Sequence, residues 1–558
     1  MPPLETVDAG PVRLLLRPAV AARELRGAFG PAFYLSLYDG ELDERADRVS
    51  AALPAGPLDD AAALGARVEP TDALIATSAG GAVAIARGGC CTFPLYWRRA
   101  GRQLEVTTGL PVFAEPTLSV EGLVKAAAAV NFCSSYEPNA WCETPLAGWR
   151  RLRRGVVTVI GADGDAHETP VLHGDTGDVT ADAAASAVRD ALEAYGASQR
   201  RVVTSLVEVS GGFDSTLAAA AALRPGHRMH GVSAAFPYYE FRHEEAVQQA
   251  VARALGVART VIDGAETFPY TPATRPVRFD EPAVFVTGIR HAERVGELAA
   301  ALGATHIYNG HGGDQLFATD LTQAEAFAPR RPQRGPFSSA AWRTMRRAID
   351  DIRRNAAVRD RRCATFVYDA RQDVWIKETF GAVLRTPFTD LALFRAAEAW
   401  SRHCRTRSAR PDKRVLADAA GDWLPPEVVD RQGKVAYDGV WMRAYAANLE
   451  PIAGAFERVS GVLEHIGLSP AWLVRRAEAL AGWQSVSDRE VLAAYAIAVW
   501  LAAWGIERVT DVAWADEAQS SVSILKKKFW NRRPSSRPVP KYAVAPCARC
   551  ASNSTRRL

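Results

Sequence analysis

Strand-like and helix-like patterns of hydrophobic residues alternate through the middle of the chain. Four short apolar runs are typical of buried strands: residues 202–210, 228–236, 258–263 and 305–310. Alanine-rich or amphipathic stretches between them predict three helices, over residues 215–223, 243–257 and 291–303. Because parallel neighbours need crossover connections, this rhythm predicts an α/β fold with a doubly wound parallel sheet.

The pattern changes on either side of this region. Residues 31–166 contain short apolar runs broken by Gly, Pro and Asp, which predict mostly β structure, and an alanine-rich helix follows within residues 173–196. Beyond residue 320 nearly everything has a helical pattern, and the last segment is basic and rich in Pro and Ser, as in a flexible tail. We therefore expect a mostly-β domain, an α/β domain with a helical C-terminal half, and a tail, with the bounds 1–175, 176–525 and 526–558.

Composition and charge exclude several classes. The chain has 558 residues, 48% of them hydrophobic, and 67 Lys plus Arg against 63 Asp plus Glu, so neither disorder nor a nucleic-acid or membrane surface is indicated. The start lacks a long apolar core, and residues 491–506 are too short to span a membrane, so we expect a buried helix there behind the capping box of Ser487 and Glu490. Eight cysteines, including Cys547 and Cys550 in the tail, predict thiols in a reducing cytoplasm.

A glycine-rich loop follows directly on the first apolar strand. Residues 210–216 read SGGFDST and lead into an alanine-rich helix, so backbone N–H groups and the helix N-terminus form a cradle for an anion such as a phosphate group. Asp214 beside that cradle implies a cation, and Mg²⁺ is the usual one. The alternative is a tight turn that needs only glycine and a capping aspartate. The nucleotide-binding residues that we expect are Ser210, Gly211, Gly212, Asp214, Ser215, Ser233 and Gly310.

A second acidic loop strengthens the nucleotide interpretation. Residues 310–317 read GHGGDQLF and follow the strand over residues 305–310. Ligands of an open parallel sheet bind beyond the carboxyl ends of its strands, where such loops converge. Asp214 and Asp314 are therefore predicted to share one magnesium pyrophosphate.

These motifs carry a resemblance to a known family. SGGFDST resembles the pyrophosphate loop of the ATP pyrophosphatases, and GHGGDQLF resembles the GxGxDE loop of the asparagine synthetases. Residues 385–393 (RTPFTDLAL) and 412–439 match later family segments, and Lys434 matches the family's late catalytic lysine. The resemblance implies an adenine nucleotide α-hydrolase-like synthetase domain that follows an Ntn-glutaminase-like domain, with ATP and Mg²⁺ as cofactors.

Two departures from the family change the expected chemistry. The family's glutaminase uses a cysteine directly after the initiator methionine, where this chain has Pro2, so we expect the first domain to be inactive in glutamine hydrolysis. Asparagine synthetases carry Glu where this chain has His311 and again where it has Gln315. Since an imidazole titrates near neutrality, His311 is a candidate base for the incoming amine, although it could equally serve to pack or hydrogen-bond the loop.

The altered loop looks most like that of the lasso peptide cyclases. That resemblance implies a ligase that adenylates an Asp or Glu side chain of a precursor peptide, which the peptide's own N-terminal amine then attacks to close a macrolactam. A leader-peptide protease and a leader-recognition protein would then be partners. Alternatives are a small-molecule cyclase like the β-lactam synthetases, an ammonia-dependent asparagine synthetase, and a non-catalytic nucleotide-binding scaffold. The arginines within residues 343–362 predict a solvated helix face rather than a site.

Overall fold

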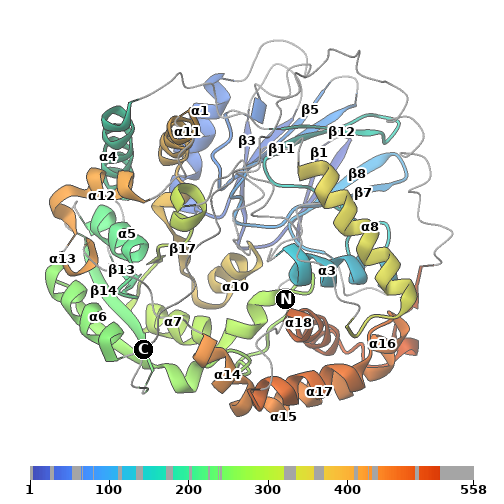
Figure 1. Ribbon diagram of the computed structural model, residues 1–558. Coiled ribbons are helices and arrows are strands. Elements are labelled where there is room, and N and C mark those ends of the chain that lie inside the picture. Colours follow the sequence, from blue (N-terminus) through green and yellow to red (C-terminus); the bar gives the residue numbers. More distant parts are fainter. Residues whose placement is uncertain are drawn as a thin grey trace, which may run out of the picture. The chain divides into compact units, whose positions relative to one another are not determined.

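The first part of the chain forms two stacked β-sheets (Figure 1). One has the strand order β1-β2-β8-β7-β10 and the other the order β12-β11-β6-β5-β4-β3. The strands are β1 (Glu5–Ala9), β2 (Val12–Leu16), β3 (Ala21–Leu25), β4 (Ala32–Ser36), β5 (Ala73–Thr77), β6 (Val83–Arg87), β7 (Tyr96–Ala100), β8 (Gln103–Thr107), β10 (Arg150–Arg151), β11 (Val156–Ile160) and β12 (Ala166–Pro170). The predicted mostly-β region is confirmed, and it begins earlier than expected, because β1 to β3 precede residue 31.

The sheet that contains β4 has a hydrophobic core on each of its two faces, because successive side chains of a strand point to opposite faces. Phe33 and Leu35 of β4 pack between the sheets with Val12 and Leu14 of β2, whereas Tyr34 faces the opposite side. Helix α1 (Leu42–Ala52) covers that opposite side. The period of two along each strand therefore gives one face to each core.

The following part of the chain contains the predicted parallel sheet. Its order is β15-β14-β13-β16-β17, and every neighbouring pair is parallel. The strands are β13 (Thr204–Glu208), β14 (Arg228–Ala235), β15 (Ala258–Asp263), β16 (His306–Tyr308) and β17 (Val383–Arg385). The first four coincide with the predicted apolar runs. β17 was not expected, because its three residues lie within a region whose pattern is otherwise helical.

Helices cover both faces of this sheet (Figure 1). α5 (Phe213–Leu223) and α6 (Arg242–Ala254) connect β13 to β14 and β14 to β15, and α4 (Ala181–Ser198) packs against α5. α7 (Ile289–Leu302) leads back from β15 to β16, so right-handed crossovers place it on the opposite face, where α10 (Ala370–Phe380) packs against it. The fold is the doubly wound, adenine nucleotide α-hydrolase-like arrangement that the sequence predicts.

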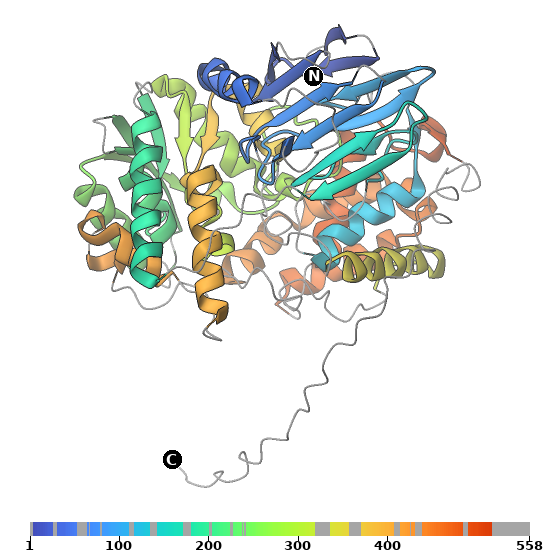
Figure 2. The same ribbon diagram turned by 90° about the horizontal axis from the view of Figure 1, so that it is seen from above.

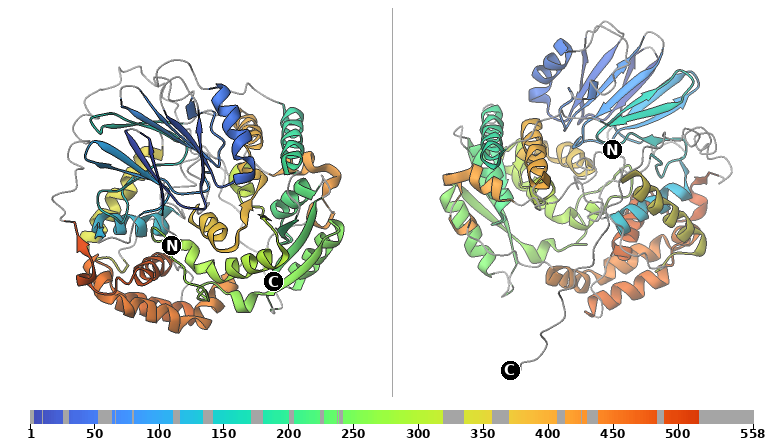
Figure 3. Two further views of the ribbon diagram at one scale, coloured as in Figure 1. Left: turned by 180° about the vertical axis from the view of Figure 1, so that it is seen from behind. Right: turned by 45° about the horizontal axis from the view of Figure 1, so that its top comes forward.

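The C-terminal half of the described chain is mainly helical (Figures 2 and 3). Its helices are α8 (Ser339–Ala356), α11 (Leu391–Thr406), α12 (Arg414–Ala420), α13 (Pro426–Val429), α14 (Asp438–Ala447), α15 (Leu449–Arg458), α16 (Ser460–His465), α17 (Pro470–Ala481) and α18 (Arg489–Ala503). α18 packs against α3 (Val120–Cys133) and is buried, as predicted. In the described part of the chain, no helix has the length and apolarity that a membrane crossing requires.

The structure is a computed structural model that describes most, but not all, of the chain. The described residues are 4–9, 11–25, 31–52, 64–65, 67–78, 81–110, 116–133, 142–170, 180–199, 204–223, 227–236, 238, 242–318, 335–356, 370–406, 413–424, 426–429, 438–483 and 489–515. Lys434, Ser487, Cys547 and Cys550 lie outside them, and so do the predictions made for them. Of the arginines expected on a solvated face, Arg343, Arg346 and Arg347 are exposed on α8.

Candidate active site

The first glycine-rich loop joins β13 to α5 at the carboxyl edge of the parallel sheet. Gly211 has a φ of 75°, a conformation that favours glycine, and it turns the chain from the strand into the helix that starts at Phe213. The Ser210 hydroxyl accepts from Gly212 N–H at 3.1 Å and lies 2.7 Å from the Ser215 hydroxyl. The loop is thus a closed turn at a helix N-terminus, which is the geometry that the sequence predicts for an anion cradle.

The hydroxyl of Ser233 on β14 and the carboxyl of Glu208 on β13 lie on the strands beside this loop. The Ser233 hydroxyl, buried on β14, donates to the Val209 carbonyl at 2.6 Å, so this serine braces the strand end from which the loop starts. Its expected contact with ATP stays a prediction. Glu208, the last residue of β13, has its pKa raised to about 7 by burial. An acid that titrates near neutrality therefore lies two residues before Ser210.

The second loop follows β16 and is held by hydrogen bonds at both ends of His311. Its N–H donates to Asn309 Oδ1 at 3.1 Å, and its carbonyl accepts from the Thr386 hydroxyl at 2.8 Å. Gly312 has a φ of 105°, after which a short π-helix starts at Asp314. The chain therefore turns sharply at the glycine and presents the Asp314 side chain, which is exposed.

The two loops pack against each other through glycine. A Cβ atom added at Gly310 would lie 2.2 Å from the backbone nitrogen of Ser215, and one added at Gly313 would lie 2.4 Å from the carboxyl carbon of Asp214. Real Cβ atoms do not approach other atoms so closely. The prediction that the two loops converge is therefore matched by the structure, and the glycines at 310 and 313 are what allow the approach.

A lysine that the sequence analysis did not single out joins the two acidic residues. Lys413 Nζ lies 2.5 Å from Asp214 Oδ2 and 2.6 Å from Asp314 Oδ1. The Asp214 side chain is 12% exposed and the Asp314 side chain 55%. The aspartates thus face each other across one ammonium nitrogen, at the place where a shared cation was predicted.

This donor set fits a magnesium ion that arrives with a nucleotide. Mg²⁺ is commonly held by one or two carboxylates together with substrate phosphates, and Asp214 and Asp314 supply two carboxylates at one point. The ammonium of Lys413 stands where such a cation would neutralise them, and it can turn to a phosphate when the carboxylates have another partner. Their role as metal ligands remains a prediction.

The segment after β17 holds the second loop in place through a hydrogen bond and an aromatic contact. Besides the contact of Thr386 with His311, the ring of Phe388 packs edge-on against Phe317, with ring centroids 6.3 Å apart. Phe317 and Phe388 are both completely buried. The RTPF segment, residues 385–388, was noted in the sequence only as a family resemblance. In the structure it holds the loop that carries His311 and Asp314.

Most residues of this site were predicted from the sequence, but Lys413, Thr386 and Glu208 were not. Residues 412–439 were noted for Lys434, whereas the lysine that reaches the described site is Lys413, from the start of the same segment. Its position just before α12, in a segment already matched to the family, was the available signal. Thr386 lay within a noted motif but had no assigned role, and no sequence signal pointed to the acid at Glu208.

Comparison with known proteins agrees with this geometry. Residues 185–378 match the sequence model of the family described as asparagine synthase. They include most of α4, β13, both glycine-rich loops and most of the parallel sheet. A comparison with curated protein sequences found no match.

The matched region is accordingly an asparagine synthase-type domain. A domain of this kind implies ATP-dependent formation of an amide or another C–N bond, with ATP as the energy source. The match over this domain therefore suggests an ATP-using C–N ligase.

Proposed function

We propose that the protein activates a carboxylate by adenylation and transfers the acyl group to an amine, with release of AMP and pyrophosphate. The observation that carries the proposal is the convergence of Asp214, Asp314 and Lys413 at the edge of the phosphate loop. A carboxylate does not react usefully with an amine because its leaving group would be oxide, and adenylation replaces that group with AMP.

The residues of the chain act mainly by position and charge. The carboxylate attacks the α-phosphorus of ATP while the loop of Ser210 to Ser215 and the N-terminus of α5 hold the departing pyrophosphate. Mg²⁺, held by Asp214 and Asp314, would neutralise phosphate charge. Lys413 can donate to the same phosphates, and the amine that attacks the acyl-adenylate gives up a proton, for which His311 is the proposed acceptor. Lys434 is proposed to stabilise the α-phosphate.

As the particular substrate we propose a precursor peptide whose Asp or Glu side chain is joined to its own N-terminal amine. Support comes from His311 and Gln315, which make the second loop resemble that of lasso peptide cyclases rather than that of asparagine synthetases. A leader-peptide protease and a leader-recognition protein would accompany such an enzyme. A β-lactam synthetase-like activity on a small molecule, ammonia-dependent amidation of aspartate, and a silent scaffold are the competing outcomes.

One assay separates these outcomes. The purified protein is incubated with ATP, Mg²⁺ and either candidate peptides, small amino diacids, or aspartate with ammonia, and pyrophosphate release is followed together with product mass. Loss of one water from a peptide supports cyclisation, and the same peptide with an acetylated N-terminus should release pyrophosphate without closing. Turnover only with aspartate and ammonia would exclude the peptide substrate.

A matched variant tests the site itself. Asp214→Ala should abolish pyrophosphate release with every substrate and leave the fold intact, because Asp214 lies in the first turn of α5 and is not part of the apolar core. Unchanged turnover in this variant would remove the proposed metal site.

A further inference from the structure

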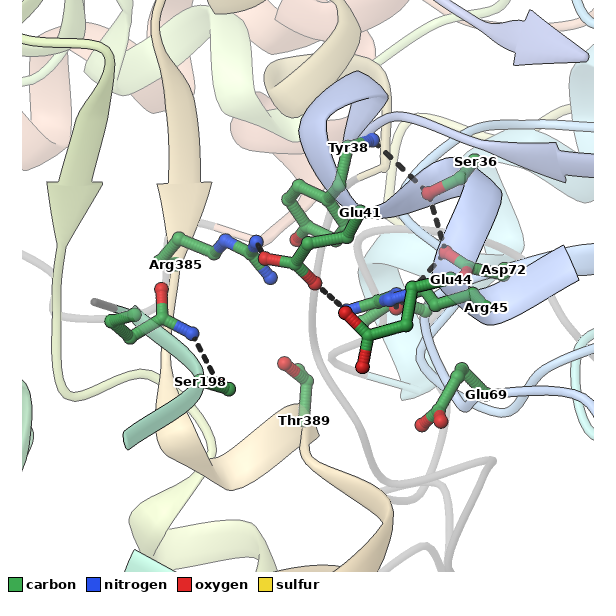
Figure 4. Close-up of polar contacts among 12 residues, drawn as sticks. Ser36, Tyr38, Glu41, Glu44, Arg45, Glu69, Asp72, Ser198, Arg385 and Thr389 are labelled. Carbon is green, nitrogen blue, oxygen red and sulfur yellow. Dashed lines mark hydrogen bonds and ion pairs between the residues drawn. The ribbon is translucent and has the colours of Figure 1, made fainter. Parts of the chain in front are cut away.

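The end of strand β17 connects the N-terminal part of the chain to the second loop. The Tyr38 hydroxyl donates to the Leu384 carbonyl at 3.2 Å, and the Arg385 guanidinium lies over the Tyr38 ring, 3.7 Å from its centroid. Arg385 also forms an ion pair with Glu41 (Figure 4). Two successive residues of β17 are thus held by one short segment, residues 38–41.

The same strand end holds the loop of His311. Arg385 accepts a hydrogen bond from Asn309 N–H through its carbonyl, at 3.0 Å, and the next residue, Thr386, donates to the His311 carbonyl. An uninterrupted chain of contacts therefore runs from Glu41 through Arg385 and Thr386 to His311. Asp314 lies three residues further along.

Glu41 is also held by a network of buried polar groups of the N-terminal part of the chain. Arg45 lies 2.5 Å from Glu41 and 2.8 Å from Asp72, and Asp72 accepts a hydrogen bond from Ser36 at 3.0 Å (Figure 4). Asp72 also accepts a hydrogen bond from Tyr34 at 2.8 Å. Burial acts to raise the pKa of Glu41, but the charges of Arg385 and Arg45 outweigh it and lower that pKa. Glu41 is therefore a charged, well-anchored partner for Arg385 at neutral pH.

Other buried ion pairs join the N-terminal part of the chain to residues outside the two glycine-rich loops. Arg17 pairs with Asp280 and with Glu378 of α10, and Arg151 pairs with Glu281. These contacts therefore end in the segment before α7 or in α10, and not at the loops. They hold the two parts together. The pair of Glu41 and Arg385 differs because Arg385 is bonded to Asn309, and the next residue, Thr386, is bonded to His311.

We propose that Glu41 and Arg385 are positioning residues that hold the second loop in the geometry in which Asp314 meets Asp214 and Lys413. Among the described residues, β17 is the edge strand of the sheet and pairs only with β16. Its free edge can shift unless side chains hold it, and a shift would carry Thr386 and the loop with it. This inference rests on the proposed function, because the loop matters only if it serves ATP.

The first test compares Glu41→Gln with Glu44→Gln. Glu44 lies three residues further along the chain, in α1, and forms an exposed pair with Arg48, so it is the matched control. We expect Glu41→Gln to lower kcat/KM for ATP by about 10- to 100-fold, because small misplacements of reacting groups cost rates of that order. The control should keep the wild-type value. Should Glu41→Gln not fold, Arg385→Lys, which keeps the charge but loses the stacking on Tyr38, replaces it.

A second test distinguishes positioning from general destabilisation. Thr386→Val removes the hydroxyl bonded to His311 at nearly constant shape, so it cuts the last contact of the chain. If Glu41 acts through that contact, the double variant loses less kcat/KM than the product of the single losses. Losses that multiply, or a Glu41→Gln variant with a lower melting temperature but unchanged kinetic constants, would overturn the inference.

Calorimetric titration with ATP and Mg²⁺ separates this inference from the proposed function. If the wild-type protein binds ATP but releases no pyrophosphate with any acid, the proposed function fails. The inference is then decided by binding alone, since Glu41→Gln should still weaken ATP binding by at least threefold relative to Glu44→Gln. Equal affinities for the two variants would refute it.

Discussion

Replacement of Lys413 by methionine tests the central contact of the site. Methionine keeps much of the length of the side chain and removes the ammonium, so Asp214 and Asp314 are left as two carboxylates without their shared cation. The contact to the largely buried Asp214 is worth about 2 kcal/mol as a charge-assisted hydrogen bond. The contact to the exposed Asp314 adds less than about 1 kcal/mol. We therefore expect Lys413→Met to lower the free energy of unfolding by about 2–3 kcal/mol.

The corresponding change in melting temperature is small but measurable. For a folded unit of about 500 residues the entropy of unfolding is near 1 kcal/mol per kelvin, so the midpoint should fall by about 2–3 °C. Added Mg²⁺ should recover part of this loss in Lys413→Met and change the wild-type midpoint less, because the ammonium competes with Mg²⁺ for the carboxylates. Differential scanning fluorimetry with and without Mg²⁺ measures both effects.

The kinetic effect should be larger than the effect on stability. If Lys413 donates to the phosphates of ATP, its loss should reduce pyrophosphate release by at least about 100-fold. Lys125→Met is the matched control, because Lys125 also lies between two carboxylates, Glu121 and Glu143, each at 2.8 Å, but in α3, away from both loops. The control should lose stability and keep activity. Wild-type stability and wild-type pyrophosphate release in Lys413→Met would refute the reasoning.

Two further predictions concern Gly313 in the second loop and Glu208 at the end of β13. Gly313→Ala should abolish ATP-dependent pyrophosphate release, because its Cβ would lie 2.4 Å from the carboxyl carbon of Asp214 and would push the loops apart. At Gly381, which has a positive φ, an added Cβ atom would meet nothing within 4 Å, so Gly381→Ala should cost stability alone. Burial raises the pKa of Glu208 to about 7, so its stabilising contribution is present below its unfolded pKa and is lost as the pH rises towards 7. Glu208→Gln should remove this pH dependence between about pH 4.5 and 7 in urea titrations, and an unchanged pH profile would show that Glu208 is not the group responsible.

The local pattern of the sequence determined the main elements and the two loops. The alternation of short apolar runs with amphipathic stretches predicted four of the five strands of the parallel sheet and the helices between them, because burial on one or both faces leaves a fixed period in the sequence. Gly211 and Asp214 marked the phosphate loop, and Gly310 and Asp314 marked its neighbour, since each motif is complete within a few residues. The carboxyl ends of parallel strands meet at one edge, so their convergence followed as well.

Only the tertiary structure decided which distant side chains complete the site. Lys413 is 199 residues from Asp214, and Arg385 is 344 residues from Glu41, and no periodicity in the chain links such positions. Lys413 was one lysine in a segment with two candidates, and Glu41 was one of several acids in the polar segment that leads into α1. A local pattern records which face of an element is buried, whereas the identity of the partner depends on how the elements pack. Packing brings these charges together, and it is the source of both the lysine between the aspartates and the link from Glu41 to the second loop.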